Sequence, residues 1–291
     1  MKTIRVAGVP EHFNYPWKSL IASGAFDREG LLVQWTDVPQ GTGRMCDMLR
    51  SGETDLAVIL TEGIVRDIAN GNPSCILQEY VSTPLLWGIH VAAGSPYRSI
   101  EDLRGKTVAI SRMGSGSHLM AVVHASSMGW DTSAMKFEIV ETIDGAIEAL
   151  TSGRADYFMW ERFMTKPLVD KGVFRHLGDS PTPWPCFVLA ARREFVHQCG
   201  GDMDTMLAIL NRYTSNFRTD PNLAGAIAQI MGLKTGDVES WLELTQWSAQ
   251  PASEEMLNNV QNHLLQLSLI HKKATFTQLT CAAARCKDGE P

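Results

Sequence analysis

The chain has 291 residues, of which 44% are hydrophobic and 20% charged, and its formal net charge is −6. This length allows two domains, and the composition is that of a globular rather than a disordered protein. The acidic charge and the lack of a Lys/Arg run argue against nucleic acid as a partner. No apolar run reaches the roughly 18 residues of a membrane-spanning helix, so we expect no direct membrane insertion.

The opening residues MKTIRVAGVP predict a strand from Ile4, because a short apolar run ends at Gly8 and Pro10. That run is too short to be the apolar core of a secretory signal. We therefore expect a cytoplasmic protein as the sequence stands, and a periplasmic protein if a signal peptide has been trimmed.

A helix followed by a strand is predicted at residues 49–60, which read LRSGETDLAVIL. Gly52 suits a helix end, because the residue after the last turn often adopts a positive φ. The aspartate Asp55 then leads into an apolar strand. The same pattern returns at residues 150–161 as LTSGRADYFMWE, with Gly153 in the place of Gly52.

Two further matches fall at nearly the same offset along the chain. The segment from Ile4 resembles that from Thr107, and the segment from Leu32 resembles that from Lys136. The three offsets are 103, 104 and 101 residues. Each half therefore runs strand, helix, strand, helix, strand, which predicts parallel βαβ units in two lobes of similar build.

Two β-prone segments, 75–93 and 180–192, are predicted to connect the lobes, and the chain beyond them is predicted to be helical. We assign residues 1–90 and 190–291 to lobe one and residues 91–189 to lobe two. Helical spacing indicates one apolar face through Met203, Met206, Leu207, Leu210 and Phe217, a helix that ends at Gly232, and another face through Met256, Leu257, Val260, Leu264 and Leu267. The last dozen residues are expected to be frayed.

The six cysteines form no CxxC pair, and no second pair or histidine motif completes a zinc site. We therefore expect buried free thiols in a reducing compartment, and no metal.

The whole chain resembles the type II periplasmic-binding-protein family, in particular the branch of sulfonate, taurine and nitrate binders and NMT1/THI5-like proteins. The resemblance is carried by the L-x-S-G-x-x-D motif near residue 50, by SIEDLRGKTVAISRMGSGSH at 99–118 and by LTSGRADYF at 150–158. The segment VPEHFNYPW at 9–17 further resembles cytosolic members without a signal sequence. The resemblance implies two Rossmann-like α/β lobes with a hinge and an interlobe cleft, and a helical C-terminal tail. It also implies a small-molecule ligand, and a transporter as partner if a leader has been removed.

Ligands of open α/β sheets bind beyond the carboxyl ends of the strands, which selects the loops at 10–14, 39–44, 61–63, 111–117, 142–145 and 160–163. The candidate ligand-binding residues in these loops are Glu11, His12, Phe13, Asn14, Thr42, Arg44, Glu62, Arg112, Ser115, Gly116, Ser117, Trp160 and Glu161.

The loop SRMGSGS at 111–117 lacks the lysine of a phosphate-binding Walker loop and the third glycine of a dinucleotide fingerprint, so we predict no nucleotide cofactor. A helix start with the hydroxyls of Ser115 and Ser117 still suits a carboxylate, sulfonate or phosphate. The alternative is that either serine only caps the helix. Thr42 has the same two interpretations, and Arg44 or Arg112 either supplies a positive charge or is exposed on the surface.

His12 either bonds the ligand, titrates near neutral pH, or makes a structural hydrogen bond to a backbone carbonyl. Trp160, like Trp87 and Trp184, either stacks on a planar ligand or packs at the hinge. Glu62 and Glu161 are candidates for a ligand amine or for contact with the other lobe.

The sequence therefore predicts a protein that closes two lobes around an anionic or heteroaromatic ligand, sulfonate-like or pyrimidine-like. No catalytic motif is recognisable, and no cofactor is expected. The alternative is a cytosolic enzyme on the same fold, of the thiamine-pyrimidine precursor or menaquinone-pathway dehydratase type, with His12 or Glu11 as acid or base. A regulatory effector domain is a third class.

Overall fold

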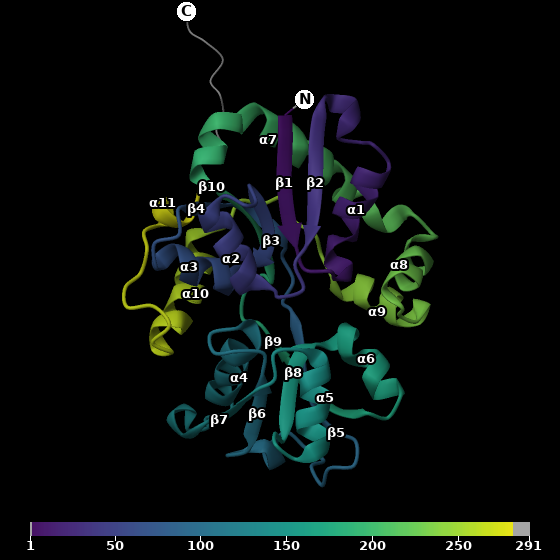
Figure 1. The fold of residues 1–291 in the computed structure, drawn as a ribbon, viewed down its shortest axis with the longest axis vertical. Coiled ribbons are helices and arrows are strands. Elements are labelled where there is room, and N and C mark those ends of the chain that lie inside the picture. The colour runs from purple at the N-terminus through teal and green to yellow at the C-terminus, as the bar shows by residue number, and fades with distance from the viewer. Residues whose placement is uncertain (1, 282–291) are drawn as a thin grey trace, which may run out of the picture. The chain divides into compact units, whose positions relative to one another are not determined.

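The structure is a computed structural model that describes residues 2–281 (Figure 1). The chain divides into two compact units, and each unit is built around one five-stranded sheet. Unit 1 comprises Met1–Thr83 and Trp184–Pro291, and unit 2 comprises Pro84–Pro183. Both divisions fall within the segments predicted to connect the lobes.

The sheet of unit 1 has the strand order β2-β1-β3-β10-β4. Strand β1 pairs in parallel with β2 and β3, whereas β10 is antiparallel to both of its neighbours. The strands are β1 (Lys2–Gly8), β2 (Leu31–Asp37), β3 (Leu56–Leu60), β4 (Ser74–Val81) and β10 (Phe187–Arg192). The helices are α1 (Tyr15–Ala22), α2 (Thr42–Ser51), α3 (Thr61–Ala69), α7 (Arg193–Ser215), α8 (Leu223–Met231), α9 (Thr235–Leu244), α10 (Glu254–Gln266) and α11 (Phe276–Leu279).

The sheet of unit 2 has the order β7-β6-β8-β5-β9, with β5 antiparallel to both of its neighbours. Its strands are β5 (Leu86–Ala92), β6 (Thr107–Ile110), β7 (Lys136–Ile139), β8 (Tyr157–Glu161) and β9 (Phe174–Pro181), and its helices are α4 (Gly116–Ser127), α5 (Ile143–Ser152) and α6 (Arg162–Asp170). The two sheets thus have the same topology, with β1, β2 and β3 corresponding to β6, β7 and β8. This confirms the repeat predicted from the sequence.

The aspartate of the repeated motif joins the central strand to its parallel neighbour in each unit. In unit 1 the Asp55 amide donates to the Arg5 carbonyl, and the Arg5 amide donates to Asp55 Oδ2, both at 3.0 Å. In unit 2 the Asp156 amide donates to the Thr107 carbonyl, and the Thr107 amide donates to Asp156 Oδ2, both at 2.8 Å. The motif therefore joins the chain before the central strand to the neighbouring parallel strand by a reciprocal pair of hydrogen bonds in each unit.

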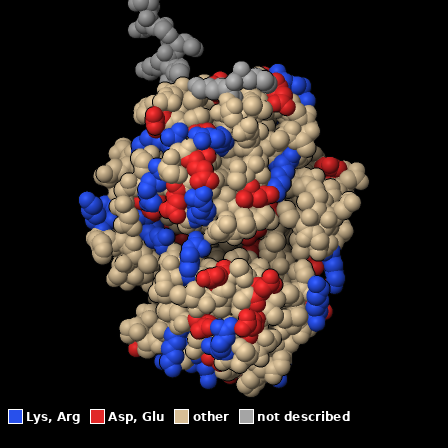
Figure 2. All heavy atoms as spheres, viewed as in Figure 1, with Lys and Arg blue, Asp and Glu red and all other residues tan. Residues whose placement is uncertain are grey.

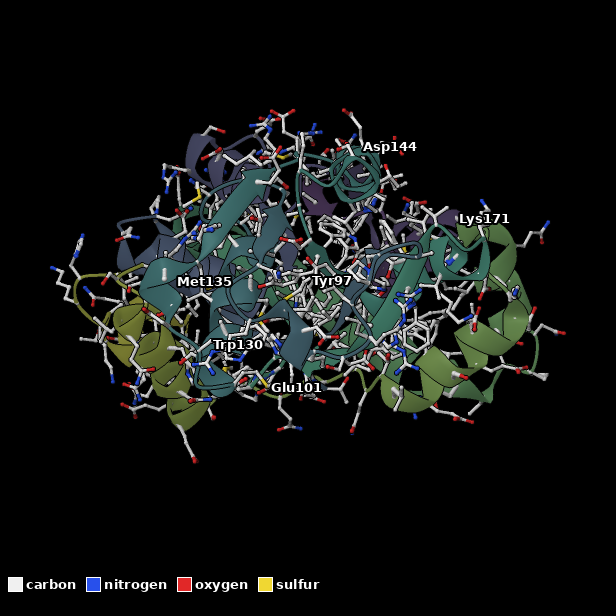
Figure 3. The ribbon with its side chains drawn as sticks, turned by 90° about the horizontal axis from the view of Figure 1, so that it is seen from below. Tyr97, Glu101, Trp130, Met135, Asp144 and Lys171 are labelled. Atoms are coloured by element: carbon white, nitrogen blue, oxygen red, sulfur yellow. A yellow bond between two sulfur atoms is a disulfide. The ribbon has the colours of Figure 1, made fainter. Side chains whose placement is uncertain are left out.

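The second carboxylate oxygen of that aspartate has a different partner in each unit. Asp55 Oδ1 accepts from Arg5 Nη2 at 2.6 Å and from Arg192 Nη2 at 3.1 Å. Asp156 Oδ1 accepts from the hydroxyl of Tyr97, which is labelled in Figure 3, at 2.6 Å. The same pair of backbone hydrogen bonds is therefore supported by ion pairs in unit 1 and by a hydrogen bond from a tyrosine hydroxyl in unit 2.

The helix ends predicted from glycine are confirmed. Gly52 and Gly153 end α2 and α5 in the left-handed region, at φ 75° and 77°. A residue with a Cβ would be strained there. Gly232 likewise ends α8, and the predicted faces bury Met203, Met206 and Leu210 on α7 and Leu257, Val260 and Leu264 on α10. Phe217 is buried too, but it lies beyond the end of α7 in a separate 3-10 helix, Phe217–Thr219, so the prediction of one continuous helical face is wrong there. Helices α10 and α11 pack against α3, so the C-terminal region contributes to the core of unit 1.

The expectation that the cysteines are free thiols is wrong for one pair, because Cys75 and Cys281 form a disulfide. Sequence spacing could not show this, since the two cysteines are 206 positions apart. The bond ties residues 271–281, here called the C-terminal strap, to β4, where the Cys281 amide also donates to the Ile76 carbonyl at 3.1 Å. Cys46, Cys186 and Cys199 are buried, and none of them forms a disulfide with a described residue. Cys286 and most of the predicted frayed end lie outside the described residues.

Within residues 2–281, no helix combines the length and the apolar character that crossing a membrane requires. Lysine and arginine alternate with aspartate and glutamate on the face drawn in Figure 2, so neither sign of charge dominates it.

Candidate functional site

The carboxyl ends of β1, β2 and β3 lie at one edge of the sheet of unit 1, because these strands are parallel neighbours. The loop after β1 leads into a short 3-10 helix, His12–Asn14, and then into α1. Pro16 stands in the first turn of α1, where its missing N–H costs no helical hydrogen bond. No loop separates β3 from α3, since α3 begins at Thr61 directly after Leu60.

His12 and Phe13 turn into the core of unit 1. His12 is fully buried, lies face to face with Phe13 and meets the ring of Trp241 edge-on at 4.1 Å. Among the described residues neither ring nitrogen of His12 has a hydrogen-bond partner, so it makes no bond to a backbone carbonyl. Burial lowers the pKa of His12 to about 3, so His12 is neutral at pH 7 and does not titrate there. Phe13 packs on Phe187, and its carbonyl accepts from the Tyr80 hydroxyl at 2.9 Å.

Glu11 and Asn14 flank that aromatic pair. The Asn14 side-chain amide donates to the Val9 carbonyl at 2.8 Å, whereas its buried Oδ1 has no partner among the described residues. Burial raises the pKa of Glu11 to about 7, so its carboxyl group holds a proton for part of the time at neutral pH. This loop therefore offers unpaired polar groups at the sheet edge.

Glu62 lies in the first turn of α3, beyond the central strand of the sheet. It is 1% exposed, and its Oε2 accepts from the indole nitrogen of Trp184 at 2.8 Å. Its Oε1 is buried and has no partner among the described residues. Burial raises the pKa of Glu62 to about 7 against the opposing effect of the Trp184 hydrogen bond. Trp184 thus orients a carboxyl group of which one oxygen is unsatisfied.

Thr42 and Arg44 sit at the start of α2, but they differ in surroundings. The residue that caps α2 is Gly41, and Thr42, predicted as the cap, is the first residue inside the helix. A Cβ on Gly63 would lie 2.2 Å from Thr42 Cγ2, so glycine lets the starts of α2 and α3 approach closely. Arg44 forms an exposed ion pair with Glu53 at 2.5 Å, which directs its guanidinium along the surface of α2.

A cluster of serine hydroxyls forms the carboxyl edge of unit 2 between β6 and α4. Ser117 Oγ accepts from the Ser111 amide at 3.0 Å and lies 3.0 Å from Ser115 Oγ and 3.3 Å from Ser111 Oγ. Ser115 caps α4, because its Oγ accepts from the His118 amide. All three serines are under 10% exposed. The cap and the hydroxyl cluster therefore coexist, and Gly116 opens the helix between the two predicted serines.

The remaining candidates of unit 2 lie in two places. Arg112 is half-buried in the turn before α4, where its carbonyl accepts from the Ser115 amide at 3.1 Å. Glu161 ends β8 and caps α6, with Oε2 accepting from the Met164 amide at 2.7 Å. Trp160, next to it, stacks on Phe158. The carboxylate of Glu161 is thus engaged in its own helix, unlike that of Glu62.

Two residues, Ser111 in unit 2 and Trp184 in unit 1, were not among the predicted site residues. Ser111 belongs to the hydroxyl cluster, and its position at the end of β6 in a loop already selected could have identified it. Trp184 was predicted either to stack on a planar ligand or to pack at the hinge, and no sequence signal pairs it with Glu62 across 122 positions. Among residues 2–281, no three His, Cys, Asp or Glu side chains group as metal ligands would.

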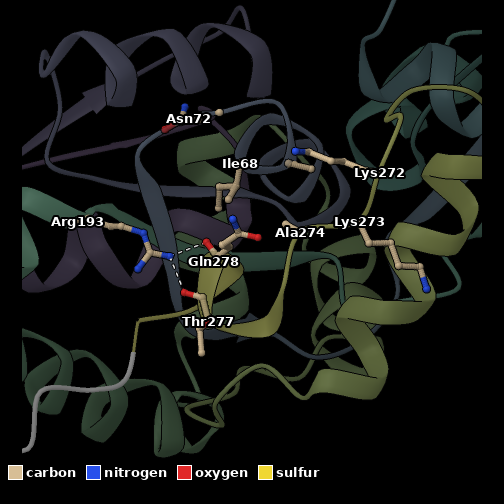
Figure 4. Close-up of a pocket in the computed structure, with 10 residues that line it drawn as sticks. Ile68, Asn72, Arg193, Lys272, Lys273, Ala274, Thr277 and Gln278 are labelled. Atoms are coloured by element: carbon tan, nitrogen blue, oxygen red, sulfur yellow. Dashed lines mark hydrogen bonds between the residues drawn. The ribbon is translucent and has the colours of Figure 1, made fainter.

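A pocket of about 360 Å³ lies elsewhere in unit 1, beneath the C-terminal strap (Figure 4). It is lined by the end of α3 and by Arg193, Lys272 and Gln278. Arg193 Nη2 donates to the carbonyls of Thr277 at 3.0 Å and Gln278 at 2.5 Å, so this arginine holds the strap in place. Because α3 starts at the carboxyl edge of the sheet and ends at this pocket, the pocket is separate from the edge loops.

Comparison with known families matches residues 87–180, which lie within unit 2, to the Ca3427-like PBP family. Comparison with curated proteins finds no match.

Solved structures show that the chain has the type II periplasmic-binding-protein fold. The Candida albicans CA3427 gene product, described as defining a family with the generic periplasmic binding protein fold, superposes with a TM-score of 0.83 at 23% identity, over 94% of this chain and 92% of its own. The aliphatic sulphonate binding protein SsuA of Escherichia coli superposes with a TM-score of 0.76 at 19% identity, over 100% and 96%. The alkanesulfonate-binding protein SsuA of Xanthomonas axonopodis pv. citri, bound to MOPS, gives 0.77 at 18% identity, over 93% and 94%.

Proposed function

We propose that this protein binds a small-molecule solute. The observation that carries the proposal is the buried cluster of Ser111, Ser115 and Ser117 at the start of α4. Hydroxyls beside the free N–H groups of a helix start form a site for an anionic group. The fold supports the proposal, since similar structures include sulfonate-binding proteins.

The ligand class that we propose is an anionic or heteroaromatic molecule, sulfonate-like or pyrimidine-like. Its anionic group is assigned to the serine cluster, because Arg44 is paired with Glu53 and unit 1 presents carboxyl groups instead. A solute-binding protein of this fold delivers its ligand to a membrane transporter or serves as a carrier or sensor, and we propose a transporter as the partner.

Replacing Ser115 and Ser117 together by alanine is expected to weaken the binding of propanesulfonate, used as a probe, by about tenfold or more. Each serine contributes a hydrogen bond to the anion, and one such bond to a charged group contributes about 1.5–3 kcal/mol. Isothermal titration calorimetry of the wild-type chain and the double variant measures the loss.

Because Ser115 also caps α4, the double variant is expected to lose about 1 kcal/mol of stability. Ser253, which caps α10 through the Met256 amide, provides the matched control, since Ser253→Ala removes a helix cap without touching the serine cluster. Unchanged affinity in the double variant would contradict the anion site. A similar loss of affinity in Ser253→Ala would attribute the effect to stability alone.

We also propose that the protein matures in an oxidising compartment such as the periplasm. The Cys75–Cys281 disulfide supports this, because cytosolic thiols are kept reduced. The cytoplasmic location expected from the opening residues is the alternative. Mass spectrometry of protein from thiol-blocked cells separates them: a linked peptide pair supports export, and two alkylated cysteines support the cytoplasm.

The alternative function is an enzyme on the same fold, with Glu11 as its acid or base. Glu11, with its pKa raised to about 7, has the protonation behaviour of a general acid or base at neutral pH. His12 does not share that role, because its pKa of about 3 makes it a weak base. Product analysis of every bound compound distinguishes the enzyme from the binding protein.

A further inference from the structure

Glu62 suggests how the proposed solute is recognised, and this inference rests on the proposed function. Glu62 follows β3, the central strand in the order β2-β1-β3-β10-β4, so it lies at the middle of the carboxyl edge. The corresponding strand of unit 2, β8, ends in Glu161. That carboxylate caps its own helix by accepting from the Met164 amide, whereas Glu62 Oε1 accepts from no described residue.

The carboxyl group of Glu62 is held in position from two sides. Trp184 donates to Oε2 at 2.8 Å, and the ring of His263 on α10 meets the indole edge-on with centroids 5.3 Å apart. Next to Glu62, the Thr61 amide and hydroxyl donate to the carbonyls of Cys186 and Pro185 at 3.1 Å and 2.6 Å. The start of α3 is thus fixed on the segment that leads into β10.

Among the described residues, no cation forms an ion pair with Glu62. The charge of Arg66, one turn further along α3, lowers the pKa of Glu62, but burial outweighs it. On α2, Arg50 is paired with Asp47 and Asp67, which lies towards the other end of α3. From α10, His263 faces Trp184, and α11 carries no charged residue. A buried carboxylate is costly unless an opposite charge or several hydrogen bonds accompany it.

We infer that Glu62 determines ligand specificity by binding a positively charged N–H group of the solute, such as an ammonium or amidinium. The bound cation supplies the missing partner for Oε1 and compensates the buried charge. Trp184 acts as a positioning residue, because it keeps Oε2 engaged and so leaves Oε1 for the ligand.

The test compares pairs of probes that differ in the cationic group alone: 3-aminopropanesulfonate with propanesulfonate, and benzamidine with benzamide. Calorimetry on the wild-type chain is expected to show about tenfold or more tighter binding of each cationic member. Glu62→Gln is expected to abolish that difference. Glu62→Asp, which keeps the charge but shortens the side chain, should retain part of it. Glu29→Gln, an exposed change on unit 1, is the control.

The pH dependence gives an independent readout. A cation binds the ionised carboxylate, so the affinity for 3-aminopropanesulfonate is expected to rise between pH 6 and pH 8, around the Glu62 pKa of about 7. In Glu62→Gln the affinity should not change over this range. A fall in affinity with rising pH would show that Glu62 instead donates a proton to a ligand acceptor, and would overturn the inference.

The two proposals fail in different ways. If propanesulfonate binds the wild-type chain but the amino group adds nothing and Glu62→Gln changes nothing, the inference is wrong and solute binding stands. If none of the four probes binds, the result counts against both. If only benzamidine binds, and Glu62→Gln abolishes its binding, the inference holds and the anion site of unit 2 is wrong.

Discussion

Replacement of Asp55 by alanine is expected to lower the free energy of unfolding by about 2–4 kcal/mol. Asp55 is 3% exposed and accepts from the Arg5 amide and from the guanidinium groups of Arg5 and Arg192. Its loss leaves a backbone N–H without an acceptor and Arg5 without its counter-charge, whereas Arg192 keeps an ion pair with Glu194 at 3.3 Å. Because both arginines are partly exposed, water offsets some of the cost, and the effect stays below that of a fully buried ion pair. Urea unfolding followed by tryptophan fluorescence measures it.

The stability that Asp55 provides is also expected to depend on pH. Burial alone would raise the pKa of Asp55, but the hydrogen bonds and charges of Arg5 and Arg192 outweigh burial and lower it. A lowered folded-state pKa means that the contribution is complete above the unfolded pKa of about 3.9. It is lost as the pH falls through the folded value. The difference between wild type and Asp55→Ala should therefore shrink below about pH 4.

Asp156 provides the matched comparison in unit 2. It makes the same backbone clamp with Thr107 but is supported by the Tyr97 hydroxyl instead of arginines. Asp156→Ala should therefore cost less, about 1–3 kcal/mol. An Asp55→Ala effect within about 0.5 kcal/mol of zero, the range of ordinary surface substitutions, would contradict the role of the motif as a clamp.

Replacing Cys75 and Cys281 together by serine is expected to reduce the free energy of unfolding by about 2–4 kcal/mol. The bond connects cysteines 206 positions apart, so breaking it greatly increases the freedom of the unfolded chain. It also frees the C-terminal strap from β4, although Arg193 still holds the carbonyls of Thr277 and Gln278. Urea unfolding with and without a reductant measures the change.

The reductant provides the control for that prediction. Wild type should lose stability when reduced, and the double variant should not respond. Cys199→Ala removes a buried thiol that forms no disulfide, and it should leave the response of the wild type to reduction intact. Equal stability of oxidised and reduced wild type would contradict a structural role for the bond.

The repeat in the sequence correctly predicted two units of the same topology. The motif around Gly52 and Gly153 combines a glycine that ends a helix with an aspartate that accepts a hydrogen bond from the neighbouring strand. Because both features depend on local backbone geometry, the motif recurs in the two similar units. By contrast, β9 was not predicted. Its residues, FRHLGDSP, show no alternation of apolar and polar side chains, and most of them are half-buried at the edge of the sheet. Such a strand forms because β5 offers it backbone partners, which no local pattern reveals.

The sequence predicted which loops form the candidate site, because they follow the strand ends, but it did not predict which side chains of those loops form it. That rule selected the loops of Glu62, Ser115 and Ser117, because parallel neighbours must end at one edge. It did not reveal which side chains turn inward. His12 and Phe13 are polar and aromatic residues of a selected loop, yet they pack against Trp241, a residue more than 200 positions later. The partners Trp184 and Cys281 are similarly distant in sequence, so tertiary structure alone identifies them.

The most direct test of the central claim, solute binding, is a thermal-shift screen of the purified chain with sulfonates, pyrimidines, phosphorylated pyrimidines and short carboxylates. Calorimetry and product analysis then follow for each compound that stabilises the protein. A ligand at one hundred times its dissociation constant should add about 2.7 kcal/mol of stability. We predict saturable stabilisation by at least one compound class, with one ligand per chain and no product. Conversion of a bound compound to product, or no stabilisation by any of them, would contradict the account.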